Sequence, residues 1–287
     1  MTVPELLDSL RGEKIVFVPN PGNAGDSLIA ASEYFIFRSL GLNFRTIFVD
    51  DEFQLASDEV VVYGGGGNLV GLYRNAADFL SVARKLAKKI IILPHTIRDN
   101  EELLRSLSSA DIIFCREVES FNHVKSVNSA IDCRLADDMA FDLPVQDILA
   151  RSSNLGYRFW DRFTVRSAKR MLRSILYSAV FRGRTDTVSA YRGDIEGLGL
   201  ADCTLNIDIS QKFAADDMSE KSSRETAYDM FRFLLRFNVV KTDRLHVCIA
   251  AALLGRRVEL FDNSYGKNSS VYYHSMKNSF PNVTLMR

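Results

Sequence analysis

The chain has 287 residues, of which 47% are apolar and 25% charged, a composition typical of a soluble globular protein with one large domain or two of ordinary size. Lysine plus arginine and aspartate plus glutamate balance at 36 each, which excludes a global positive field for holding nucleic acid. No apolar stretch reaches the roughly 18 residues of a membrane span, and the segment from Met1 to Lys14 does not resemble a signal peptide, so we expect a cytoplasmic protein.

The first part of the chain, residues 1–148, alternates short apolar runs with amphipathic segments, the pattern of a doubly wound α/β unit. The apolar runs predict parallel strands near residues 14–19, 44–49, 59–63, 89–94, 111–115 and 133–136. The segments between them predict helices near residues 26–40, 76–88, 101–107 and 117–127.

The middle segment, residues 149–185, is rich in arginine and contains Asp161 as its one acid. Apolar residues that recur at three and four predict an amphipathic helix with a basic face over residues 158–181. The simpler interpretation is a connector whose basic face is solvated. The alternative is attraction to anionic lipid, with peripheral contact at the inner face of the membrane, or to a substrate that carries a diphosphate.

The last part of the chain, residues 186–287, returns to the α/β pattern. We expect strands near residues 187–191, 238–241 and 258–261 and helices near residues 222–236 and 244–254. Two α/β units joined by a helical connector predict two Rossmann-like domains that face a cleft, residues 1–148 and 186–287.

Cysteines and histidines do not form metal-binding patterns. The four cysteines are widely spaced without a C-x-x-C pair, which indicates buried free thiols in a reducing compartment. The four histidines are scattered, and we expect neither a metal nor a cofactor. The cysteines are Cys115, Cys133, Cys203 and Cys248.

Glycine and polar residues follow nearly every predicted strand, at the sheet edge where open α/β folds bind ligands. The run Gly64–Gly67 matches neither the dinucleotide fingerprint nor the P-loop, so it is either a loop that faces a ligand or a tight turn. In the loop before the first long helix, Asn23 and Asp26 either contact a ligand or cap that helix. His95 follows the strand predicted to end at residue 94 and faces the same cleft.

A second set of polar residues lies in the C-terminal part. Arg244 and His246 open a helix, where backbone amides and a guanidinium favour an anion. Residues two apart on a regular helix point in nearly opposite directions, so the two share a ligand only if the first turn is irregular or Arg244 reaches around it. The alternative is an arginine paired with Asp243 and a histidine in the core. Arg192 is a candidate second anion contact, and the polar loop at residues 262–268 either binds a sugar or is simply a loop.

Seven motifs, in this order and spacing, resemble the polysaccharide pyruvyl transferase family over about residues 15–270. The motifs are Asn20–Asp26, Gly64–Asn68, Leu93–Thr96, Cys115–Glu117, Asp137–Asp138, Thr242–His246 and Asp262–Lys267. The most specific are the Arg-Leu-His element at residues 244–246 and the Asn-Ser-Tyr-Gly-Lys loop at residues 263–267.

The resemblance implies a two-domain fold like that of the B-type glycosyltransferases, phosphoenolpyruvate as donor, and a product sugar that carries pyruvate as a cyclic ketal. It implies that Arg244, Leu245 and His246 bind the donor and, less securely, that Arg192 does too. The residues expected to bind the acceptor sugar are Asn23, Asp26, Gly65, Gly66, Gly67, Asn68, His95, Asn263 and Lys267. A lipid-linked oligosaccharide could supply this sugar.

The chemistry implied by the resemblance needs a proton donor and a proton acceptor. His246 is the candidate acid that protonates the enol, and His95 or Asp26 is the candidate base for the acceptor hydroxyl. The alternatives are a nucleotide-sugar-dependent glycosyltransferase of the same architecture and a non-catalytic sugar-binding protein.

Overall fold

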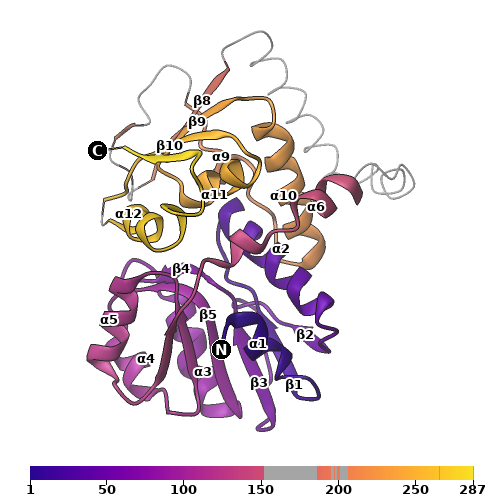
Figure 1. The fold of residues 1–287 in the computed structure, drawn as a ribbon. Helices are drawn as coiled ribbons and strands as arrows, with labels where there is room; N and C mark the ends of the chain where they lie inside the picture. Colours follow the sequence, from indigo (N-terminus) through magenta and orange to yellow (C-terminus); the bar gives the residue numbers. More distant parts are fainter. Residues whose placement is uncertain (152–185, 195–196, 198, 201–205, 265, 287) are drawn as a thin grey trace.

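The computed structural model describes residues 1–151, 186–194, 197, 199–200, 206–264 and 266–286. These residues form two sheets in which every strand pair is parallel (Figure 1). The larger sheet has the order β2-β1-β3-β5-β6-β7, with β4 paired to β5, and the smaller has the order β11-β10-β9-β8. The strands are β1 (Lys14–Val18), β2 (Phe44–Thr46), β3 (Glu59–Tyr63), β4 (Gly66–Leu69), β5 (Lys89–Ile97), β6 (Ile112–Cys115), β7 (Asp132–Leu135), β8 (Thr187–Ala190), β9 (Val239–Thr242), β10 (Arg257–Leu260) and β11 (Val283–Leu285).

Helices connect the strands, as parallel pairing requires. In the first sheet's half they are α1 (Val3–Asp8), α2 (Ala24–Ser39), α3 (Asn75–Leu86), α4 (Glu101–Ser106), α5 (Val118–Val127), the 3₁₀ turn η1 (Met139–Asp142) and α6 (Val145–Arg151). In the second half they are α9 (Ile209–Lys212), α10 (Glu220–Leu234), α11 (Leu245–Leu253), α12 (Lys267–Val271) and the π-helical turn η3 (Tyr272–Met276).

The two faces of the larger sheet bury separate apolar clusters, because successive side chains of a strand point to opposite faces. On one face, Val61 packs with residues of α3, α4 and α5 such as Leu80. On the other face, Val62 packs with residues of α1 and α2 such as Phe37. The sequence prediction of a mixed α/β fold with parallel strands covered by helices is confirmed.

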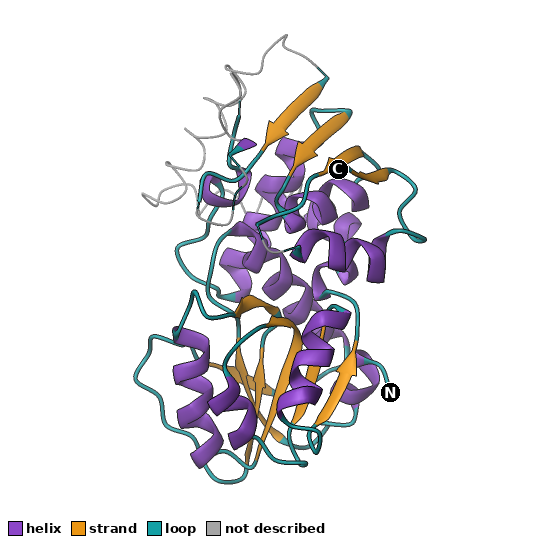
Figure 2. Ribbon diagram, turned by 90° about the vertical axis from the view of Figure 1, so that its left-hand side faces the viewer, coloured by secondary structure: helices purple, strands orange, loops and turns teal. Residues whose placement is uncertain are grey.

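Helix α2 links the two halves. Its residues share an apolar cluster with the larger sheet and with Val240 and Val258 of the smaller sheet. It also contacts α9, α10 and α11, and Figure 2 shows these helices filling the region between the sheets. The hydroxyl of Tyr34 donates a hydrogen bond to the carbonyl of Met218 at 3.1 Å across this junction. The proposed boundaries at residues 148 and 186, and the arrangement of two domains facing a cleft, stay predictions.

Three strands differ from the prediction made from the sequence. Strand β5 continues to Ile97, so His95 lies inside a strand and not after its end. Two short strands, β4 and β11, were not predicted. Strand β4 contains only glycine, asparagine and leucine, a composition with little strand propensity, and it forms because the backbone pairs with the extended end of β5. The predicted basic helix at residues 158–181 lies outside the described residues.

Three of the cysteines are confirmed as buried free thiols. They are Cys115, Cys133 and Cys248, and Cys203 lies outside the described residues. Burial raises the pKa of Cys248 above its ordinary value of 9.0, so this thiol is unreactive.

Candidate functional site

A pocket of about 350 Å³ lies at the carboxyl ends of the strands, where the two halves of the chain meet. The first half supplies Pro21, Gly22, Asn23, Asp26, Gly67, Asn68, Tyr73, Asn75 and Arg116 to its lining. The second half supplies Arg192, Asp194, Ser210, Gln211, Ala214, Arg244, Leu245, His246 and Lys267. A cavity of about 260 Å³ between α2, α6 and α10 contains none of the predicted site residues.

Most of the residues predicted from sequence therefore come together, and a few do not. The pocket is lined by Asn23, Asp26, Gly67, Asn68, Arg192, Arg244, Leu245, His246 and Lys267. It is not lined by Gly65, Gly66, His95 or Asn263.

The N-terminus of α2 forms one wall. Asn23 is the N-cap: its side chain accepts a hydrogen bond from the Gly25 N–H at 2.8 Å, while Asp26 accepts one from the Asn23 N–H at 2.9 Å. The other oxygen of Asp26 accepts a hydrogen bond from the Asn20 side chain at 2.9 Å. Burial raises the pKa of Asp26 above its ordinary value of 3.8, against the opposing effect of His246 and these hydrogen bonds. Asn23 and Asp26 therefore form the cap of α2 and also line the pocket, and their contact with a ligand stays a prediction.

The glycine run is required by close packing. A Cβ on Gly66 would lie 2.4 Å from the Asn20 side chain, and one on Gly65 would lie 2.7 Å from the Pro94 carbonyl. A Cβ on Gly67 would lie 2.7 Å from Nη2 of Arg116. Of this run, only Gly67 reaches the pocket, so the other glycines serve packing beneath it.

His95 is fully buried below the pocket. Its Nδ1 lies 3.2 Å from the Gly64 carbonyl and its Nε2 lies 3.1 Å from the Asn68 side chain. Burial, together with the Arg116 cation, lowers the pKa of His95 to about 3, so the ring is neutral at physiological pH. A neutral ring carries one proton, so it donates either to the Gly64 carbonyl at the start of the glycine run or to the Asn68 side-chain oxygen.

Arg116 is buried at the end of β6, with 1% of its side chain exposed. Its Nη1 donates to Asp138 at 2.6 Å and its Nε donates to Thr96 at 2.8 Å. Among the described residues no acceptor is bonded to its Nη2, which lies over Gly67 at the pocket wall. An arginine held by two of its nitrogens presents the third to a ligand in a fixed direction.

His246 joins the two halves of the chain at this point. Its Nε2 lies 3.3 Å from Asp138 and 3.4 Å from Nη1 of Arg116. Its Nδ1 lies above Gly25, where a Cβ would approach to 2.4 Å. Although burial acts to raise the pKa of Asp138, the charges of His246 and Arg116 hold it well below its ordinary value, so Asp138 is a permanent anion.

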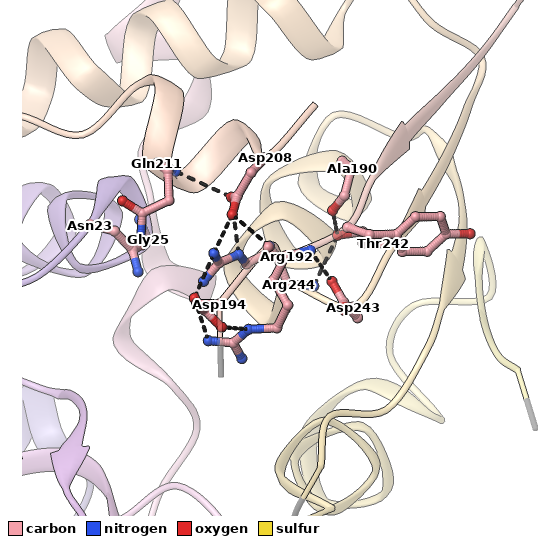
Figure 3. Close-up of polar contacts among 12 residues, drawn as sticks. Asn23, Gly25, Ala190, Arg192, Asp194, Asp208, Gln211, Thr242, Asp243 and Arg244 are labelled. Carbon is pink, nitrogen blue, oxygen red and sulfur yellow. Dashed lines mark hydrogen bonds and ion pairs between the residues drawn. The ribbon is translucent and has the colours of Figure 1, made fainter. Parts of the chain in front are cut away.

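The two arginines of the second half are held by carboxylates, as Figure 3 shows. Arg244 pairs with both oxygens of Asp208 and with Asp194 at 2.8 Å. Arg192 pairs with Asp194 at 2.6 and 3.1 Å. The partner of Arg244 is not Asp243, which instead accepts the Arg192 backbone N–H at 2.7 Å. Among the described residues, each of these two arginines is therefore paired with at least one carboxylate.

The backbone resolves how Arg244 and His246 share one pocket. Arg244 is the N-cap of α11, with φ −93° and ψ 111°, so its side chain leaves from extended backbone before the helix begins. His246 lies within the first turn. The restriction that applies to two residues of a regular helix therefore does not apply to this pair.

Lys267 and Asn263 belong to the loop after β10. Lys267 begins α12 and lines the pocket, with its Nζ 3.9 Å from the position of a Cβ on Gly67. Asn263 is buried, and its side chain accepts the Lys267 backbone N–H at 2.8 Å. Asn263 therefore shapes the loop that carries Lys267.

Sequence reasoning assigned no role to Arg116, Asp138, Asp194 or Asp208. Arg116 and Asp138 did carry a signal, since each follows a predicted strand and belongs to a motif of the family resemblance. Asp194 and Asp208 lie in the long connection after β8, where no periodic pattern pointed to them.

The described helices and side chains add two observations. None of these helices combines the length and hydrophobicity needed to cross a bilayer. Within the same part of the chain, no group of three or more His, Cys, Asp or Glu side chains is arranged to hold a metal ion.

A family model and a curated relative both point to one family. The family model described as polysaccharide pyruvyl transferase matches residues 23–265. A Bacillus subtilis (strain 168) protein named "Putative pyruvyl transferase EpsO" is 28% identical over 298 residues, which cover 98% of this chain and 91% of that protein. The crystal structure of an uncharacterized protein from Klebsiella pneumoniae subsp. pneumoniae NTUH-K2044 has a TM-score of 0.78 and 30% identity, covering 99% of this chain and 96% of that one.

Proposed function

This chain belongs to the polysaccharide pyruvyl transferase family, and from that premise we propose that it transfers pyruvate from phosphoenolpyruvate to a sugar of a polysaccharide precursor, forming a cyclic ketal. The observation that carries the proposal is the meeting of Arg244 and His246 with Arg116 and Asp26 around one pocket, although the four come from distant parts of the sequence.

The donor brings a phosphate and a carboxylate, and the pocket offers groups suited to both. Arg192 and Arg244 lie beside the N-terminus of α11, whose backbone amides also favour anions. Arg192 and Arg244 are paired with Asp194 and Asp208. Arg116 is paired with Asp138 through Nη1, and its unbonded Nη2 supplies a further hydrogen-bond donor. Guanidinium forks suit phosphate and carboxylate because they donate two parallel hydrogen bonds.

In the first step, the C=C electron pair of the donor takes a proton from His246, which forms a methyl group and leaves an oxocarbenium-like centre at C2. One acceptor hydroxyl then bonds to C2 and gives its proton to Asp26. The bond between C2 and the phosphate oxygen breaks with its electron pair, and the phosphate takes the proton held by Asp26. A second hydroxyl of the same sugar closes the ring and returns its proton to His246.

Asp26 suits the role of base better than His95. Asp26 lines the pocket, and burial raises its pKa, as expected of a group that both accepts and releases a proton. His95 lies below the pocket, and its pKa of about 3 makes it a poor proton acceptor at neutral pH. We assign His95 to support of the acceptor wall through Asn68.

The acceptor wall carries side chains that suit a sugar. Asn23, Asn68 and Asn75 offer amide groups for hydroxyls, and Tyr73 offers an aromatic face for the apolar side of a sugar ring. Lys267 adds a cation on this side, which is consistent with an acceptor that carries a phosphate, as a lipid-linked oligosaccharide does.

The direct test is incubation with phosphoenolpyruvate and a panel of galactosides, glucosides and mannosides. We expect release of phosphate together with an acceptor whose mass increases as pyruvate is added. Donor binding is measured separately by calorimetry. Stabilisation by uridine or guanosine diphosphate, with no donor binding and no phosphate release, would replace the proposal with a nucleotide-sugar transferase.

Two variants separate donor binding from chemistry. Arg244→Ala is expected to weaken donor binding by roughly 10- to 100-fold or more, because it removes a charged hydrogen-bond donor from the pocket. His246→Ala is expected to retain donor binding and lose turnover, by roughly 10²- to 10⁴-fold. Arg134→Ala, which breaks a partly exposed pair with Asp132, is the matched control. Normal binding and turnover in both pocket variants would show that the site is elsewhere.

A further inference from the structure

The side chain of Asp138 is fully buried and still ionised, an arrangement that costs free energy unless strong partners compensate. Its Oδ1 accepts the Ala140 N–H at 2.9 Å as the N-cap of η1. Its Oδ2 accepts Nη1 of Arg116 at 2.6 Å and faces Nε2 of His246 at 3.3 Å. The backbone N–H of Ala140 and the guanidinium of Arg116 fix this carboxylate, and its remaining neighbour among the described residues is the imidazole of His246.

The two ring nitrogens of His246 have different surroundings. Nε2 faces an anion that accepts hydrogen bonds, so a proton on Nε2 is held there. Nδ1 lies above Gly25, at a glycine whose missing Cβ would otherwise stand 2.4 Å away. When one imidazole nitrogen is held by a carboxylate, the other is the nitrogen that can exchange its proton.

We propose that Asp138 is the positioning residue for His246: it holds the Nε2–H and leaves Nδ1 as the nitrogen that gives its proton to the donor. The inference rests on the proposed function for the identity of the proton acceptor. The arrangement of the ring itself does not depend on that function. In the transfer, the bond between Nδ1 and its proton breaks, the enol methylene carbon gains the proton, and the neutral ring keeps its proton on Nε2.

Charged groups face His246 from several elements. Asp138 comes from the start of η1, Asp26 from α2 and Arg116 from the end of β6. Arg244 precedes His246 on its own element, and Arg192, Asp194 and Lys267 line the same pocket. Of these groups, Asp138 and Arg116 are within hydrogen-bond range of Nε2, and Asp138 is the one that can accept its proton.

The first experiment is a nuclear magnetic resonance titration of ¹⁵N-histidine-labelled protein, with Asp138→Asn against the unchanged chain. Four histidines give few signals, and His95 does not titrate in the accessible range because its pKa is about 3. Loss of the anion removes the acceptor that holds the Nε2–H. The nitrogen shifts of neutral His246 should show the proton on Nε2 in the unchanged chain, and a mixture of tautomers in the variant.

The second experiment compares kcat with donor binding. Asp138→Asn should reduce kcat on the order of 10²-fold, with donor binding little changed. Gly25→Ala should also reduce kcat, since its methyl group would lie 2.4 Å from Nδ1 and force the ring to move.

Asp132→Asn, on β7 and outside the pocket lining, is the matched control and should leave the tautomer and the activity unchanged. Thermal denaturation verifies that each variant is folded. An unchanged tautomer in folded Asp138→Asn would overturn the inference, even if donor binding and phosphate release establish the proposed function. The converse result, a changed tautomer without any phosphate release, would remove the proposed function and keep the pairing of the two residues.

Discussion

At the scale of single residues, Glu33 is a carboxylic acid in the interior of the protein, although an isolated carboxyl group prefers water. Its carboxyl group is fully buried beneath the glycine run, and one oxygen accepts the Gly65 N–H at 2.6 Å. The other oxygen has no hydrogen-bond partner in the described part of the chain. Burial raises the pKa of Glu33 well above its ordinary value of 4.5, with Asp138 and Asp26 adding to the effect, which favours the neutral form in the folded protein.

A neutral buried carboxyl predicts a pH dependence of stability. Below pH 4.5 the group is protonated in both the folded and the unfolded chain, so it does not reduce the free energy of unfolding. Above that pH only the unfolded chain releases the proton, which favours unfolding by up to about 1.4 kcal/mol per pH unit until the folded group titrates as well. Glu33→Gln, which keeps the shape and cannot ionise, should therefore gain stability relative to the unchanged chain as pH rises from 5 to 8.

Urea denaturation at several pH values measures this difference, and Glu102→Gln, an exposed position on α4, is the control. Parallel stability curves for Glu33→Gln and the unchanged chain would mean that Glu33 is ionised in the folded state.

At the scale of elements, α2 has the most connections. Its N-terminus forms the pocket wall, its buried face packs on the larger sheet, and its other contacts reach α9, α10 and α11. The helix begins at a capping box. The side chain of Asn23 accepts a hydrogen bond from the backbone N–H at Asp26, and the side chain of Asp26 accepts one from the backbone N–H of Asn23. The start of this one helix therefore determines both local stability and the position of the candidate base.

Replacement of the cap should reduce the stability of the protein. Asn23→Ala removes the acceptor for the Gly25 N–H and should lower the free energy of unfolding by about 1 kcal/mol. Asn23→Ser, which retains a capping oxygen, should lose much less. Urea denaturation of the three proteins compares them, and equal losses for alanine and serine would show that the side chain of Asn23 does not act as a cap.

At the scale of the whole molecule, two sheets share one continuous apolar cluster. Residues of the larger sheet, such as Val62, and of the smaller sheet, such as Val240 and Val258, belong to the same cluster through α2 and α11. Domains that fold independently have separate cores joined by few contacts. The units predicted from sequence, with boundaries at residues 148 and 186, thus share one apolar core, and we expect them to unfold together.

This coupling predicts a single cooperative unfolding transition. Calorimetric and van't Hoff enthalpies should agree, and unfolding followed by circular dichroism in the near and far ultraviolet should coincide. Phe231, on α10, belongs to the apolar cluster shared by both halves. Phe231→Ala should lower the free energy of unfolding by about 3–5 kcal/mol and leave a single transition. Two resolved transitions would instead support independent domains.

The sequence alone determined the α/β class and most strand positions, and about two thirds of the residues predicted for the site line the pocket. These features depend on local periodicity and on the rule that parallel strands present their carboxyl ends together. The sequence could not place His95 inside β5 or find β4, because those features arise from pairing between backbones and not from side-chain pattern.

Only the tertiary structure decided which polar residues act together. Asp138 and His246 are 108 positions apart, and their 3.3 Å approach depends on how α11 packs against α2 and η1. The pairing of Arg244 with Asp208 and Asp194, in place of Asp243, likewise depends on the path of the chain after β8. Charge and burial of such groups are set by neighbours remote in sequence, and for that reason local pattern could name the candidates without assigning their partners.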